Sequence, residues 1–265
     1  MRGTLARANA LLLAALVFAS CQSTKNPANQ APTNPVLQDL LDYRNGVAMI
    51  HDGRIDEAIV LLRRARAVNP LEPGIPNALG LALLYKRDFP MAIAMFNEAL
   101  RLDSNYVEAL NNRGVAYMET SRLDDAEKDF RTVTGAMAPA TEKRSAYYNL
   151  GMIHNRRQEW MEAEAEFTFA IREDARHLDA YRERGLARSK RENFGAALED
   201  FIFVLREEPK NVIANYQAAL CLLAQGRRDL ATKYMERAVA AGPETEEGRR
   251  AKRFLANETY LMEKR

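Results

Sequence analysis

The strongest constraint on this 265-residue chain is a pattern of small and large apolar residues that recurs about every 34 positions. The small residues follow one another at intervals of 34, 34, 37, 34 and 34, and they are Gly46, Gly80, Gly114, Gly151, Gly185 and Ala219. Twelve residues after each stands an alanine: Ala58, Ala92, Ala126, Ala163, Ala197 and Ala231. Sixteen residues after each stands a large apolar residue: Leu62, Phe96, Phe130, Phe167, Phe201 and Met235. Six matches in one register predict a repeated structural unit.

Each unit has the pattern of two antiparallel helices that pack closely. Helices can approach only where their facing side chains are small, and a large apolar residue then fills the layer beneath. A 34-residue period with these marks resembles the tetratricopeptide repeat. The resemblance implies an all-α fold, a right-handed superhelical solenoid of six repeats over residues 36–245. Residues 246–265 keep an apolar helical stripe and are expected to form a C-terminal capping helix, with these residues on one side: Ala251, Phe254, Leu255 and Met262.

The turn inside a repeat carries a signal of its own. Asp52-Gly53 and Gln225-Gly226 fall between the two helices of the first and last repeats. Glycine adopts positive φ without steric cost, so we expect positive φ at Gly53 and Gly226.

The first 35 residues have the features of a targeting segment and linker rather than of a folded core. Residues 1–20 have the basic start and apolar stretch of a secretory signal peptide, and the stretch is too short to span a membrane. Phe18-Ala19-Ser20-Cys21 resembles the lipobox of bacterial lipoproteins, which implies lipidation of Cys21; the alternative is an ordinary cleaved signal with a chance cysteine. Residues 21–35 are polar and proline-rich, typical of a flexible linker. Gln22 resembles the sorting signal for the outer membrane of Gram-negative bacteria, facing the periplasm.

Charge and composition exclude several classes of function. The net charge is +2, and it falls to zero without Arg2 and Arg7 of the signal segment, which disfavours a nucleic-acid binder. Two cysteines and three histidines leave little material for a metal cage, and Cys221 falls at a small core position of its repeat. The sequence shows no catalytic constellation. We therefore expect no enzyme, no cofactor and no small-molecule substrate.

A second apolar stripe on the first helix of each repeat is the candidate binding surface. In tetratricopeptide proteins these positions line the concave face of the superhelix, where protein partners bind. The predicted groove residues are Tyr43, Val47, Ile50, Leu81, Leu84, Tyr85, Val115, Met118, Tyr148 and Met152. The alternative is that some of them pack against the next first helix or are isolated surface residues. Repeat 5 offers Arg182 and Lys190 instead, so the groove is expected to be apolar first and polar further on.

The chain as a whole resembles the pilotin-type lipoproteins of type IV pilus biogenesis, the PilF, PilW and Tgl kind. Those proteins lengthen the junction between repeats 3 and 4, and here the long interval contains Ala138-Pro139-Ala140-Thr141 and then Tyr148-Asn149-Leu150-Gly151. The resemblance implies an outer-membrane lipoprotein that binds the pilus secretin subunit and promotes its localisation and multimer assembly. The competing class is a general periplasmic adaptor for peptidoglycan hydrolases, a protease or envelope assembly.

Overall fold

The computed structural model describes residues 35–263, with side chains described for residues 39–257. Signal peptide, lipidation site and linker were predicted for residues 1–35; all but Pro35 lie outside the described part. The thirteen helices of that part are α2 (Pro35–His51), α3 (Ile55–Val68), α4 (Gly74–Tyr85), α5 (Phe89–Leu102), α6 (Val107–Glu119), α7 (Leu123–Gly135), α8 (Ala140–Arg156), α9 (Trp160–Glu173), α10 (Leu178–Lys190), α11 (Phe194–Glu207), α12 (Val212–Ala224), α13 (Arg228–Ala241) and α14 (Glu246–Glu263).

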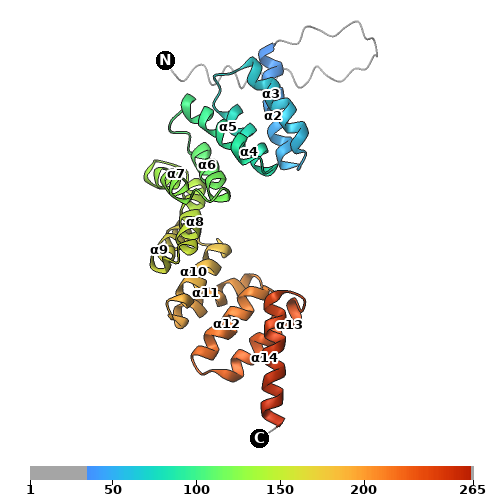
Figure 1. Ribbon diagram of the computed structural model, residues 1–265, viewed down its shortest axis with the longest axis vertical. Helices are drawn as coiled ribbons and strands as arrows, with labels where there is room; N and C mark the ends of the chain where they lie inside the picture. The colour runs from blue at the N-terminus through green and yellow to red at the C-terminus, as the bar shows by residue number, and fades with distance from the viewer. Residues whose placement is uncertain (1–34, 264–265) are drawn as a thin grey trace, which may run out of the picture.

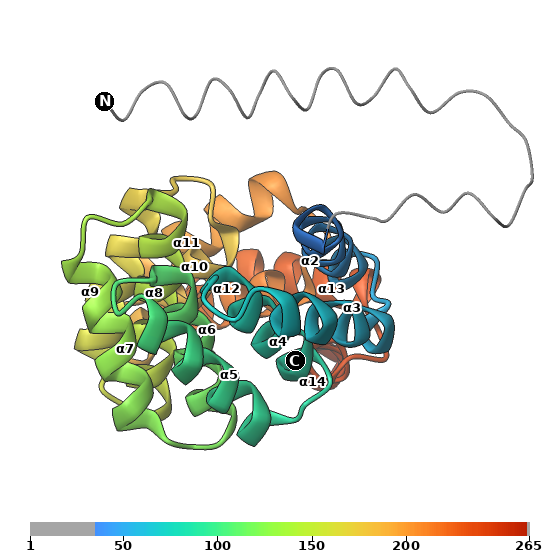
Figure 2. The ribbon, with the colours of Figure 1, turned by 90° about the horizontal axis from the view of Figure 1, so that it is seen from above.

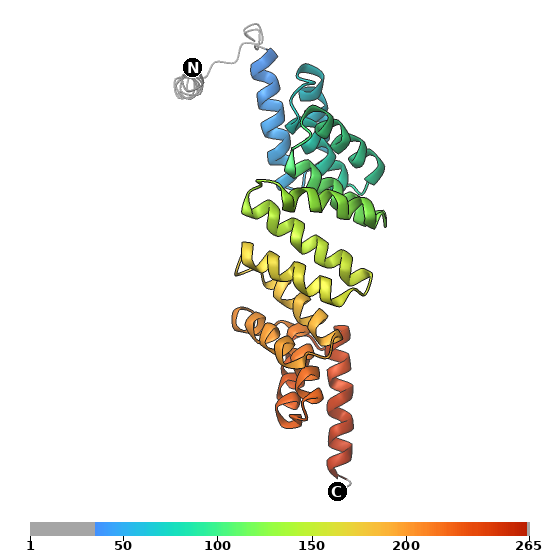
Figure 3. The same cartoon turned by 90° about the vertical axis from the view of Figure 1, so that its left-hand side faces the viewer.

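The helices form six consecutive hairpins that stack along one axis, from α2–α3 at one end to α12–α13 at the other (Figure 1). The last helix, α14, packs on α12 and α13 and extends beyond them at the end of the stack (Figure 3). Ala251 is buried there, with Phe254 and Leu255 half-buried around it. The predicted all-α solenoid of six repeats with a capping helix is confirmed. The side chain of Met262, also predicted for the capping face, lies outside the described residues.

The predicted close approach of the two helices in a repeat is present in the first five hairpins. A Cβ atom added to Gly80 would lie 2.6 Å from Cε1 of Phe96, and one added to Gly151 would lie 2.5 Å from Cε1 of Phe167. Both rings are fully buried. Gly46 meets Leu62 in the same way, at 2.7 Å. The small residue is therefore required because a ring or branched side chain occupies the space of its side chain.

The turns within the repeats all use one residue with positive φ. Gly53 and Gly226 have φ near 75°, as predicted. The equivalent residues of the other four repeats are not glycines, yet they have φ of 60–62°: Arg87, Ser121, Gln158 and Glu192. The turn geometry is thus fixed by the two helices it joins, and four side chains accept a left-handed backbone to satisfy it.

The longer interval between repeats 3 and 4 is taken up by α8. This helix has 17 residues, against 13 in the first helices α6 and α10 of the neighbouring repeats. Pro139 caps its start, and Asn111 of α6 donates its Nδ2 proton to the Glu142 carboxylate at 2.6 Å. The extra turn of helix therefore remains packed on the preceding repeat.

Ion pairs hold the two helices together in repeats 3 and 5. Asp200 is only 3% exposed, and its carboxylate accepts hydrogen bonds from Arg184 at 2.7 Å and from Arg188 at 2.9 Å. At the equivalent positions of repeat 3, Arg113 and Asp129 pair at 2.7 Å. Guanidinium–carboxylate pairs with such geometry fix the relative orientation of two helices.

Candidate protein-binding groove

The first helices of the repeats form a continuous layer. Each contacts the first helix of the next repeat, from α2 to α12, whereas no such contact links successive second helices within the described part of the chain. Seen down the stack, the second helices α5, α7 and α9 lie outside the first helices α4, α6 and α8 (Figure 2). The first helix of each repeat therefore presents one row of side chains to the inside of the superhelix.

The ten predicted groove residues fall into three groups by exposure. Tyr85 is 62% exposed. Ile50 and Met118 are only 7% exposed, so they belong to the floor and offer little surface to a partner. The remaining seven are half-buried and pack against the core from the side: Tyr43, Val47, Leu81, Leu84, Val115, Tyr148 and Met152.

The structure brings some of the predicted residues around a hollow at the first two repeats. The hollow has a volume of about 380 Å³ and is lined by Ile50, His51, Gly53, Ile55, Leu81 and Tyr85. It joins the end of α2 to the middle and end of α4. An apolar side chain of a partner could occupy it without a change in either helix.

Two tyrosines near carboxylates are Tyr43 on α2 and Tyr106, which immediately precedes α6. Burial raises the pKa of Tyr106 to about 12, and Tyr43 and Glu108 add to the rise, while a hydrogen bond with Asn77 opposes it. The pKa of Tyr43 is raised by burial and by Glu72 and Glu108. Both phenols therefore keep their protons at neutral pH and remain able to donate a hydrogen bond.

Repeat 5 carries charged residues on its first helix. Arg182 pairs with Asp179 at 2.7 Å and with Glu183 at 3.3 Å, and Lys190 is exposed. Just before this repeat, the ring centroids of His177 and Tyr148 are 5.1 Å apart, and burial lowers the pKa of His177. The position equivalent to Val47 and Leu81 is still apolar here, because the half-buried Leu186 occupies it.

Sequence reasoning missed that the apolar row extends to repeat 6. Leu220 is the equivalent of Val47 and Leu81, and it is exposed on α12. Ile213 is exposed on the same helix, and Tyr216 and Leu223 are half-buried beside it. The signal was available in the sequence, because the 34-residue register alone assigns Leu220 to the groove position.

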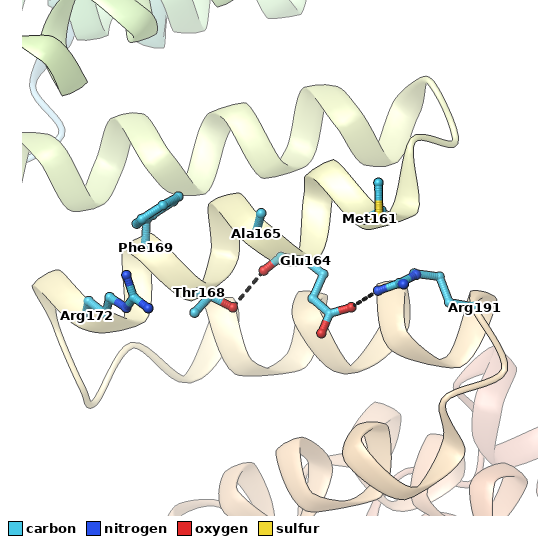
Figure 4. Close-up of a pocket in the computed structure, with 7 residues that line it drawn as sticks. All are labelled: Met161, Glu164, Ala165, Thr168, Phe169, Arg172 and Arg191. Atoms are coloured by element: carbon cyan, nitrogen blue, oxygen red, sulfur yellow. Dashed lines mark hydrogen bonds and ion pairs between the residues drawn. The ribbon is translucent and has the colours of Figure 1, made fainter.

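A second hollow lies on the outer side of the stack, over α9. Its volume is about 310 Å³, and it is lined by Met161, Glu164, Ala165, Thr168, Phe169, Arg172 and Arg191 (Figure 4). Phe169 stacks on Tyr147 with ring centroids 5.1 Å apart, and Glu164 pairs with Arg188 and Arg191. The sequence had not suggested a surface on this helix.

The residues that might carry chemistry have structural roles. Cys221 is buried in the core of repeat 6, as predicted, with its sulfur 3.4 Å from the Ser189 hydroxyl, and burial raises the pKa of the thiol. No group of three or more His, Cys, Asp or Glu side chains in the described region could hold a metal ion. No helix of that region is long and apolar enough to cross a membrane.

The family comparison agrees with this geometry. The tetratricopeptide repeat profile matches residues 77–140 and 182–245, on the two sides of the longer junction. The chain therefore contains tetratricopeptide repeats. Its repeats also match short stretches of curated proteins, including a STIP1 homolog of Dictyostelium discoideum (29% identical over 103 residues) and a lipoprotein NlpI homolog of Haemophilus influenzae (36% over 69 residues). These two stretches are 36% and 26% of this tetratricopeptide-repeat chain but only 18% and 22% of the relatives' own length.

Solved structures resemble the tetratricopeptide-repeat chain over much greater lengths. Pseudomonas aeruginosa PilF superposes with a TM-score of 0.73 over 82% of this chain and 97% of its own, at 18% identity. PilW, a widely conserved type IV pilus biogenesis factor, superposes with a TM-score of 0.71 over 80% and 96%, at 16% identity. YrrB, a repeat protein with an unusual peptide-binding site, gives 0.61 over 72% and 97%, at 19% identity. At identities this low, the superpositions establish a shared fold and no more.

Proposed function

We propose that this protein is an outer-membrane-anchored periplasmic scaffold that binds the secretin subunit of a type IV pilus and promotes its localisation and multimer assembly. Lipid on Cys21 would provide the membrane attachment. The inner row of the first helices would provide the binding surface.

The observation that carries the proposal is the length of the match to PilF. The two chains share one arrangement of helices over 82% of this chain and 97% of PilF, which is far more than a single repeat. PilW, a pilus biogenesis factor, matches over a similar length. Many repeat proteins share two or three such hairpins, whereas a match over a whole chain of this size supports a shared type of partner.

The groove supports a protein partner better than a small molecule. Its half-buried residues form a row across four repeats, with one or two in each repeat, which suits the spaced side chains of an extended or helical segment. The mature chain has no net charge, so recognition would depend on shape and apolar contact rather than on long-range attraction.

A deletion strain tests the function directly. We expect secretin monomer to remain present while heat-stable multimers in the outer membrane are depleted or misplaced, with pilus-dependent motility lost. Complementation with the intact gene restores the multimers, and complementation with Cys21→Ser restores them poorly while releasing the protein from membrane fractions. Normal multimers in the deletion strain would contradict the proposal.

Substitutions in the groove test the surface. Tyr85→Ser and Leu220→Ser remove exposed apolar side chains of repeats 2 and 6 without opening the core, and we expect weaker co-purification of secretin with unchanged helical content. Met161→Ser on the outer side of α9 is the matched control. If Met161→Ser weakens capture of secretin and the groove variants do not, the partner binds on the outer side of the stack and not in the groove.

The general periplasmic adaptor remains the second candidate. It is supported by the local match to a lipoprotein of Haemophilus influenzae over 69 residues. Under this function, the protein captured from solubilised outer membrane would be a peptidoglycan hydrolase, a protease or an envelope assembly factor, and secretin multimers would be normal without it.

A further inference from the structure

Exposed aliphatic side chains gather at one end of the first repeat. Leu40 and Leu41 lie near the start of α2, Val68 ends α3, and Leu71 in the turn after it is 76% exposed. Helices α2 and α3 are antiparallel, so the start of one lies beside the end of the other, and the pair between Asp42 and Arg64 at 2.8 Å joins them there. We call these four residues the entry patch, because the chain enters the fold at this end (Figure 3).

Two exposed arginines lie near the entry patch. Arg44 lies one turn along α2 from Leu40 and Leu41, and Arg63 lies on α3; neither has an acidic partner among the described residues. Of the nearby acidic residues, Asp39 and Asp42 are buried. Glu72 is exposed beside the patch, where it accepts a hydrogen bond from the Gly74 backbone at 3.2 Å and interacts with Tyr43.

The chain length before the fold determines what can reach this surface. Only thirteen residues separate Cys21 from the first residue of α2, and that segment spans at most about 50 Å when fully extended. If Cys21 carries a lipid, the entry patch can never leave the neighbourhood of the bilayer. A tether of this length creates a high effective concentration, so even a weak surface affinity is sufficient for docking.

We propose that the entry patch docks on the anionic phospholipid surface to which the lipid anchor attaches. Leu71 and Val68 enter the boundary between headgroups and acyl chains, while Arg44 and Arg63 contact lipid phosphates. The inference rests on the proposed anchor at Cys21. Its consequence is an upright orientation, with α2 at the membrane and α14 at the far end of the stack, so that the groove faces sideways at a fixed height (Figure 1).

Fluorescence quenching tests docking independently of lipidation in the cell. The mature full-length chain with Cys221→Ala keeps Cys21 as its one thiol, and a maleimide-lipid attaches it to vesicles of phosphatidylethanolamine and phosphatidylglycerol. The chain has one tryptophan, Trp160, on α9. Trp160→Phe combined with Leu71→Trp moves that fluorophore to the entry patch, and brominated lipids then report its contact with acyl chains.

We expect brominated lipid to quench the indole introduced at position 71 strongly, and to quench Trp160 of the chain without the Leu71→Trp change hardly at all. Adding Arg44→Glu and Arg63→Glu should reduce the quenching at position 71 at least about twofold, as should replacing phosphatidylglycerol by a neutral lipid. Leu230→Glu at the far end of the stack is the matched control and should change nothing.

Vesicle-attached protein in which the indole at position 71 stays unquenched overturns the proposal, whether that indole is in water or is covered by a second protein copy. Failure of Cys21→Ser to release the protein from the membranes of cells would instead overturn only the proposed anchor.

Discussion

Repeats 2 and 5 are built on one pattern but are held together by different forces. Both place a glycine of the first helix against a buried phenylalanine of the second. The residues just before these two are Leu79 and Met95 in repeat 2, both buried in one apolar cluster, and Arg184 and Asp200 in repeat 5, an ion pair. The first helix changes with them, because Asn77 and Tyr85 of repeat 2 are replaced at the equivalent positions of repeat 5 by Arg182 and Lys190.

The difference between the two repeats shows which residue positions must keep their size and which can change their chemistry. The small residue and the large apolar side chain opposite it set how close the two helices come. This layer therefore recurs with glycine in five of the six hairpins and with Ala219 in the last. The adjacent layer needs only two side chains that satisfy each other. An apolar pair and a guanidinium–carboxylate pair both meet that need, although they respond differently to mutation and pH.

Removing the carboxylate of repeat 5 should have the largest effect on stability. Asp200→Ala leaves the half-buried guanidinium of Arg184 without its acidic partner, and Glu164 remains the only acidic partner of Arg188 among the described residues, at a cost of about 3–5 kcal/mol in the free energy of unfolding. Urea denaturation followed by circular dichroism measures it. Glu207→Ala at the exposed end of α11 is the control and should change stability by less than about 0.5 kcal/mol. A loss below about 1 kcal/mol for Asp200→Ala would mean that the pair does not hold repeat 5.

The glycine layer is tested by adding a side chain in repeat 2. Gly80→Val places a branched side chain where Phe96 already lies, and we expect a loss of about 1–3 kcal/mol. Gly195→Ala on α11 is the matched control, because nothing lies within 4 Å of its Cβ position and alanine favours a helix. That variant should gain up to about 1 kcal/mol. Equal melting temperatures for the two variants would show that helix approach is not what requires Gly80.

Helix α9 and the helices of repeat 2 should also begin to lose stability at different pH values as the solution is acidified. Burial acts to raise the pKa of Glu164, but Arg188 and Arg191 outweigh it and the pKa lies below its usual value of 4.5. A carboxylate with a lowered folded pKa contributes stability above its unfolded pKa and loses it as pH falls through the folded pKa. Amide hydrogen exchange should therefore accelerate in α9, which carries Glu164, below pH 4.5 before it does in α4 and α5. The same acid onset in all three helices would contradict this.

The smallest effect is expected at the turns. Glu192 adopts φ of 61° where the equivalent residue of repeat 6 is Gly226. Glu192→Gly relieves the left-handed strain but adds backbone entropy to the unfolded chain, so we expect a gain of at most about 1 kcal/mol. Gly226→Ala should lose a similar amount. Thermal melts of both variants check the sign, and destabilisation by Glu192→Gly would show that the Glu192 side chain contributes contacts.

The sequence predicted the parts of the molecule that depend on residue size. Glycine and phenylalanine at fixed spacing have one good explanation, so the hairpins, the cap and the core position of Cys221 followed. The ion pairs did not follow, because Arg184 and Asp200 stand sixteen residues apart and look like solvated helix faces until the helices are placed. The burial of Ile50 and Met118 was missed for a related reason, since a stripe on a first helix faces both the groove and the next first helix.

Site-specific photo-crosslinking in piliated cells tests the central claim most directly. A crosslinking side chain at position 85 sits at the hollow between α2 and α4, and one at position 161 sits on the outer side of α9. The proposed function predicts crosslinks to the secretin subunit from position 85 and none from position 161. Secretin captured from position 161 but not from position 85 would contradict binding at the groove.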